Sequence, residues 1–118
     1  MVVLIDIGNT RAKYCIINEG ERGAQQSIVN ENLCDDFLNA NFATAEKLVV
    51  ASVSHYSLTD KINVWCQKQQ IIYQHVVSER KKNGVVNAYQ VAAQLGVDRW
   101  LALIGAAVLF PQKNVLII

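Results

Sequence analysis

The chain has 118 residues, of which 52% are hydrophobic, and its 11 basic and 10 acidic residues leave a formal net charge of +1. A chain of this length can bury a core as one domain, and a charge this small gives no general attraction to nucleic acid or anionic membranes. The longest apolar run, residues 100–110, is shorter than the roughly 20 residues of a membrane-spanning helix. Three widely spaced cysteines and a start without a signal-peptide pattern predict reduced thiols and a cytoplasmic protein.

The N-terminal segment is predicted to form a β-hairpin with a carboxylate near its tip. Apolar residues at 2–5 and 12–17 predict two strands, and Gly8 and Asn9 between them favour the positive φ angles of a tight turn. The backbone N–H groups of such a turn can bind phosphate, and Asp6 could hold a hard cation that bridges phosphate oxygens. The alternative is an ordinary hairpin whose polar side chains only satisfy the turn.

A polar turn at residues 19–23 separates the hairpin from a third antiparallel strand predicted around residues 25–29. Helical spacing of apolar residues then predicts a helix over residues 30–41, with Asn30 as its N-cap.

The next three elements are predicted to alternate between strand and helix. A continuous β-branched run at 47–53 is typical of a strand buried on both faces, residues 58–69 have a helical apolar face, and residues 71–77 return to strand character. This alternation predicts parallel strands joined by a crossover helix.

Two further helices are predicted near the end of the chain. Asn87 is the expected N-cap of the first, which continues to Leu95 and is ended by Gly96. Asp98 is the expected N-cap of the second, over residues 99–109, which Pro111 follows. This second helix is apolar nearly all round, so the sheet and another subunit are expected to cover it.

Several residues have simpler interpretations. Asp98 can be a capping residue with Arg99 as its exposed neighbour, and the charged run 79–82 is expected to be a solvated loop. His55 and His75 lack partners at metal-ligand spacing, so they are expected to be ordinary surface or core residues. The tryptophans, Trp65 and Trp100, are predicted to anchor the core.

Two segments together resemble a known family. Asp6-Ile7-Gly8-Asn9-Thr10 with Lys13, and Leu95-Gly96-Val97-Asp98-Arg99-Trp100 preceded by Tyr89, are similar to the N-terminal half of type III pantothenate kinases. The resemblance implies an α/β fold of the ribonuclease H-like kind, as in the actin, sugar kinase and Hsp70 superfamily, with a mixed sheet, an N-terminal antiparallel hairpin and flanking helices. Residues 1–118 would then be the N-terminal domain of a two-domain kinase whose C-terminal domain is absent from this chain.

The activity implied by this resemblance is ATP-dependent phosphorylation of pantothenate to 4'-phosphopantothenate, the first step of coenzyme A biosynthesis. Asp98 would be the general base that takes the proton of the substrate hydroxyl. The expected substrate-binding residues are Tyr89, Gly96, Val97, Asp98 and Arg99. The expected ATP phosphate-binding residues are Asp6, Ile7, Gly8, Asn9, Thr10, Arg11 and Lys13.

The resemblance also implies cofactors and partners. Asp6 would position Mg²⁺ with the ATP phosphates, and a monovalent cation, K⁺ or NH₄⁺, would bind outside this chain. The expected assembly is a homodimer that binds pantothenate and ATP but neither nucleic acid nor a membrane. Asp6 and Asp98 are expected to face one shared crevice. Val86 and Ala88 depart from the basic residue and the glycine that the family often has there.

The end of the chain bears on activity. Residues 115–118 are predicted to form a strand that in the family leads into a second phosphate motif, so this chain alone is expected to be an inactive fragment. Two other functions remain open: a ribonuclease H-like nuclease, which needs further carboxylates for two metal ions, and a transcriptional accessory or regulatory protein of the same family.

Overall fold

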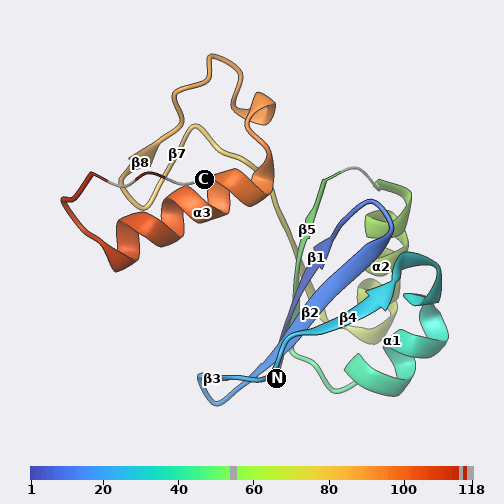
Figure 1. Cartoon of the computed structure of the whole chain (residues 1–118). Coiled ribbons are helices and arrows are strands. Elements are labelled where there is room, and N and C mark those ends of the chain that lie inside the picture. The colour runs from blue at the N-terminus through green and yellow to red at the C-terminus, as the bar shows by residue number, and fades with distance from the viewer. Residues whose placement is uncertain (54–55, 115, 117–118) are drawn as a thin grey trace. The chain divides into compact units, whose positions relative to one another are not determined.

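The chain divides into two compact units, Met1–Val76 and Val77–Ile118. The computed structural model describes residues 1–53, 56–114 and 116, and Figure 1 shows the elements in each unit. His55 and, apart from Leu116, the strand predicted over residues 115–118 fall outside this description. Within the described residues, no helix has the length and apolar character needed to span a membrane.

The first unit begins with the predicted hairpin. Strands β1 (Val2–Ile7) and β2 (Arg11–Asn18) are antiparallel, with Ile7 opposite Ala12. The prediction of a positive-φ turn is wrong, because neither Gly8 nor Asn9 is among the residues with positive φ. Instead the Gly8 N–H donates to the Arg11 carbonyl at 2.9 Å. Asn30, which lies outside the hairpin, also forms hydrogen bonds to the loop.

Two short strands follow and pair with the free edge of β2. They are β3 (Glu21–Arg22) and β4 (Gln26–Val29), and both run antiparallel to β2, which confirms the predicted third strand. The helix predicted to start at Asn30 is broken into the 3-10 helix η1 (Asn30–Asn32) and the helix α1 (Asp35–Phe42). Asn30 is therefore not an N-cap, because its side chain bonds the hairpin instead.

The alternating part of the chain is confirmed. Strand β5 (Lys47–Ser52), helix α2 (Tyr56–Gln69) and strand β6 (Ile72–Val76) follow one another. β5 runs parallel to both β1 and β6, so the sheet order is β3-β2-β1-β5-β6, with β4 beside β2.

One face of this sheet carries the core of the first unit. Because side chains alternate along a strand, every second residue of β1 and β5 faces the helices α1 and α2, which Figure 1 shows on the same side of the sheet. These buried strand residues are Val3, Ile5, Ile7, Leu48 and Val50. They pack with Leu38, Phe42, Ile62 and Trp65 of the two helices. The predicted mixed sheet with an N-terminal antiparallel hairpin and flanking helices is confirmed at this level of detail.

The second unit contains little regular structure before its long helix. Strands β7 (Lys81–Lys82) and β8 (Val85–Val86) form a small antiparallel hairpin, and Ala92–Gln94 form the 3-10 helix η2. The helix predicted over residues 87–95 is therefore wrong. Its expected cap, Asn87, is fully buried and bonds other parts of the same loop, so the polar side chain that suggested a helix start instead stabilises irregular backbone.

Helix α3 (Val97–Leu109) starts two residues earlier than predicted, with Gly96 as its N-cap. Gly96 therefore opens a helix rather than ending one, and Asp98 lies in the first turn rather than at the cap. The helix ends before Pro111, as predicted. Trp100 is fully buried, whereas Leu101, Val108 and Leu109 are exposed within this chain. Cover of this helix by the sheet and by another subunit stays a prediction.

Candidate functional site

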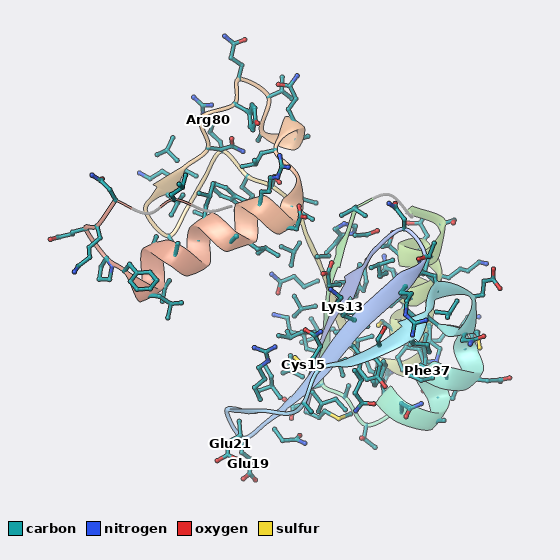
Figure 2. All side chains as sticks on the ribbon, viewed as in Figure 1. Lys13, Cys15, Glu19, Glu21, Phe37 and Arg80 are labelled. Carbon is teal, nitrogen blue, oxygen red and sulfur yellow. The ribbon has the colours of Figure 1, made fainter. Side chains whose placement is uncertain are left out.

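The hairpin tip brings two of the predicted phosphate residues together. Asp6 and Lys13 are register partners on β1 and β2, and both are exposed. Since Ile5 and Ile7 face the core, Asp6 projects from the opposite face of the sheet, and Lys13, which is labelled in Figure 2, shares that face. Directly opposed residues have Cβ atoms about 4.5–5.5 Å apart, so a carboxylate and an ammonium group can act on one ligand here.

The neighbouring residues contribute in other ways. Ile7 is fully buried, so only its backbone could contact a phosphate. A Cβ atom on Gly8 would lie 3.0 Å from the Arg11 carbonyl oxygen, so a larger residue would fit only if the backbone at Arg11 moved slightly. Arg11 is exposed, and its Nε donates to the Ser27 hydroxyl at 3.0 Å, which turns this guanidinium group toward β4.

Asn9 and Thr10 border a hollow between the hairpin loop, η1 and the first turns of α2. The hollow has a volume of about 380 Å³, and Asn30 and Lys61 also line it. The expected phosphate residues therefore divide into an Asp6 and Lys13 pair on one sheet face and the two loop residues at this hollow. Lys61 of α2 also lines this hollow and brings a positive charge to it from outside the hairpin. The sequence did not predict this contribution.

The larger cavity in the first unit lies elsewhere. It measures about 720 Å³, and its walls include Leu38, Ile62 and Trp65 from α1 and α2. None of the residues predicted to bind phosphate lines it.

The predicted substrate turn stands at the start of α3. Asp98 lies in the first turn, where the helix dipole favours a negative charge, and its Oδ1 accepts from the Arg99 N–H at 2.9 Å. A Cβ atom at Gly96 would lie only 2.8 Å from this Oδ1, so the glycine leaves the space that the carboxylate uses. Asp98 and Arg99 are exposed, whereas Val97 is 8% exposed and could meet a ligand only through its backbone.

Tyr89 is held by contacts that the sequence did not reveal. Its ring is 44% exposed, while its N–H donates to Asn87 Oδ1 at 3.0 Å and its carbonyl accepts from Arg80 at 2.7 Å. Asn87 Nδ2 in turn donates to the Ala92 carbonyl at 3.2 Å. The expected solvated run 79–82 therefore contains a structural arginine, which Figure 2 labels in the second unit. A lone arginine in a charged run gives no sequence signal of this role.

Among the described residues, two ionisable groups of the first unit have clearly shifted pKa values: Cys66 in the core and Tyr73 packed against it. Burial raises the pKa of the Cys66 thiol to about 11. Burial also raises the pKa of Tyr73, and the negative charges of Cys66 and Asp60 raise this pKa further. The three cysteines are free thiols.

Metal binding at the hairpin rests on a single carboxylate. Mg²⁺ is often held by one or two carboxylates together with substrate phosphates, so an exposed Asp6 beside the residues expected to bind phosphate fits this ion. Across residues 1–53, 56–114 and 116, no three His, Cys, Asp or Glu side chains gather where they could hold a metal. The two-metal nuclease alternative therefore gains no support from the described residues.

Comparison with known proteins gives one consistent family. The family model for type III pantothenate kinase matches residues 2–118. The type III pantothenate kinase of Colwellia psychrerythraea is 45% identical over 118 residues, which are 100% of this chain and 47% of that protein. The enzyme of Dechloromonas aromatica is 30% identical over 118 residues, covering 99% of this chain and 50% of that protein.

The chain thus spans about half the length of these relatives. Among solved structures, it is similar to the Aquifex aeolicus PPX-GPPA enzyme with a TM-score of 0.34 and 9% identity, over 64% of this chain and 35% of that one, which is too low to support a shared fold. The match over residues 2–118 shows that the chain belongs to the type III pantothenate kinase family.

Proposed function

We propose that this chain supplies the N-terminal part of an ATP-dependent pantothenate kinase, which makes 4'-phosphopantothenate in the first step of coenzyme A biosynthesis. The observation that carries the proposal is the family match over residues 2–118, which includes both motifs. The shape of each motif supports it, because each places exposed polar groups at the end of a regular element.

The hairpin is proposed to bind the phosphates of ATP. Lys13 supplies positive charge, the backbone of Asn9 and Thr10 supplies N–H donors, and Asp6 would hold Mg²⁺. The bound ion would neutralise phosphate charge. Phosphoryl transfer depends mainly on positioning and charge stabilisation, and these residues are suited to both.

The turn before α3 is proposed to bind pantothenate. Arg99 would pair with the substrate carboxylate, while the ring of Tyr89 would contact its chain. As the substrate hydroxyl oxygen forms its bond to the γ-phosphorus, the bond from that phosphorus to the leaving ADP oxygen breaks, and the hydroxyl proton passes to an Asp98 carboxylate oxygen. The exposure of Asp98 supports this role, since a buried base could not reach a bound substrate.

Finer features of the family are part of the same proposal. Residues 1–118 would be the ribonuclease H-like N-terminal domain of a two-domain kinase, in which Asp6 and Asp98 serve one reaction. The hairpin and the parallel β1-β5-β6 order support this assignment. A second domain would complete the nucleotide site and hold the monovalent cation, K⁺ or NH₄⁺. The enzyme is proposed to act as a homodimer in the cytoplasm.

The test is pantothenate phosphorylation by the protein expressed from the intact gene, compared with an Asp98→Asn variant. We expect the variant to lose about 10²–10⁴-fold in kcat because the proton acceptor is gone. Its melting temperature should fall only slightly, since Asp98 is exposed and a charge in the first turn of a helix contributes about 0.3–1 kcal/mol. The matched control is Asp36→Asn, another exposed aspartate in the first turn of a helix, which should keep full activity.

Two results would contradict the proposal. One is an intact protein that binds ATP but transfers no phosphate to pantothenate. The other is an Asp98→Asn variant with undiminished kcat, which would remove Asp98 as the base while leaving the kinase activity in place.

A further inference from the structure

Asn30 reaches from the end of β4 to the hairpin loop and bonds it twice. Its backbone N–H donates to the Thr10 carbonyl at 2.9 Å, and its side-chain Nδ2 donates to the Gly8 carbonyl at 2.9 Å. The two residues that it holds flank Asn9, at the centre of the loop. One residue 22 positions from Gly8 in the chain therefore fixes both sides of the predicted phosphate loop.

These two bonds set the orientation of the loop peptides. In a planar trans peptide the C=O and the following N–H point in opposite directions, so a fixed Gly8 carbonyl also fixes the direction of the Asn9 N–H. In the same way, the fixed Thr10 carbonyl fixes the Arg11 N–H. Since the loop is not a positive-φ turn, its shape does not follow from local φ preferences alone.

The hydrogen-bond network around the Asn30 amide favours one orientation of its side chain. Its Oδ1 is buried and accepts no hydrogen bond from a protein group, which is unfavourable for a buried acceptor. Turning the amide over would place Oδ1 against the Gly8 carbonyl oxygen, so two acceptors would meet where a hydrogen bond now forms. The Asn30 Nδ2 group therefore donates to the Gly8 carbonyl, although Oδ1 of the same amide has no donor.

We propose that Asn30 is a positioning residue for phosphate binding, which holds the carbonyl groups of Gly8 and Thr10 away from the ligand and keeps the loop N–H groups directed toward it. This inference rests on the proposed function of the hairpin. Without Asn30 these peptides can rotate, and a carbonyl oxygen turned toward a phosphate would repel it.

The test uses the 118-residue chain labelled with ¹⁵N and titrated with magnesium tripolyphosphate, while the amide signals of Gly8, Asn9 and Thr10 are followed. Asn30→Asp keeps the shape of the side chain but replaces the Nδ2 donor with an oxygen that faces the Gly8 carbonyl. We expect it to raise the Kd by at least about tenfold. Asn30→Ala, which removes the donor without adding charge, should raise the Kd by a smaller factor.

The matched control is Asn32→Asp. It adds the same charge two positions away, at an exposed residue of the same 3-10 helix, and should leave the Kd within about twofold, since exposed charges act weakly at a distance. Circular dichroism should show that each variant compared is folded at the temperature of the titration. Should Asn30→Asp fail to fold, Asn30→Ala carries the same comparison.

Each outcome decides a different point. Equal Kd values for the wild type and both Asn30 variants would overturn the positioning role and leave phosphate binding by the hairpin intact. A wild-type chain whose loop signals do not respond to the probe would overturn phosphate binding by this loop, and the positioning role with it. A selective loss in the Asn30 variants, with Asn32→Asp unchanged, supports the inference.

Discussion

The two units of this chain are stabilised in different ways. The first has a continuous apolar core between one sheet face and two helices, and the motif expected to bind phosphate joins β1 and β2 of that sheet. In the second unit the motif expected to bind substrate lies at the start of α3 and in the preceding loop, which is held by hydrogen bonds around Asn87 and Arg80. Few described side chains of this unit are buried, Trp100 among them. Mutations should therefore act through packing in the first unit and through hydrogen bonds in the second.

The largest expected effect is Phe42→Ala in the first unit. Phe42 is fully buried and packs edge-to-face against Tyr14 and Phe37, with ring centroids 5.4 and 5.5 Å away. Removing this ring should lower the free energy of unfolding by about 3–5 kcal/mol, measured by urea denaturation. Phe110→Ala, at a ring that is 51% exposed after α3, should cost less than about 0.5 kcal/mol. Similar losses in both variants would show that the units do not differ in packing.

The next effect is a pH dependence confined to the first unit. Folding raises the pKa of Cys66 from 9.0 to about 11, because burial disfavours the thiolate. The stability that this thiol contributes to the folded state is therefore fully present below pH 9. It is lost as the pH rises through about 11. The shift corresponds to about 3 kcal/mol. Unfolding free energies measured from pH 8 to 11 should fall less steeply for Cys66→Ala than for the wild type, whereas Cys34→Ala, at an exposed thiol, should follow the wild type.

A smaller effect is expected from Asn87→Ala in the second unit. The variant removes the bonds to the Ala92 carbonyl and the Tyr89 N–H from a residue that is 1% exposed, and should cost about 1–3 kcal/mol locally. Amide hydrogen exchange should become faster over residues 87–95 and stay unchanged in β1 and β5. Gln90→Ala, at an exposed residue in the same loop, is the control. Faster exchange throughout the first unit would contradict the view that each unit is stabilised separately.

The smallest effects should come from surface ion pairs, and here the two units should behave alike. Glu46 binds the N-terminal ammonium group at 3.3 Å in the first unit, and Glu79 binds Lys82 at 3.7 Å in the second. Both pairs include exposed side chains, so Glu46→Gln and Glu79→Gln should each change stability by less than about 0.5 kcal/mol, less still at high salt. A change above about 1 kcal/mol in thermal unfolding would show that one pair belongs to a larger network.

The sequence predicted most of the first unit because its elements have clear periodic patterns. Residues 47–53 are β-branched and continuous, and they form the central parallel strand β5 with a boundary error of one residue. The second unit was harder to predict, since asparagine favours helix N-caps and irregular loops alike. Asn87 was assigned to a cap, but its buried side chain bonds the loop.

The amino-acid sequence by itself determined the order of the main elements of the first unit and the two motifs that identify the family. These depend on neighbours in the chain, which periodicity and short spacing record. Only the tertiary structure decided that Asn30 bonds Gly8 and that Arg80 bonds the backbone at Asn87 and Tyr89. An amide or guanidinium group can satisfy its hydrogen bonds with many partners, and the partner is chosen by which backbone groups the folded chain brings within reach.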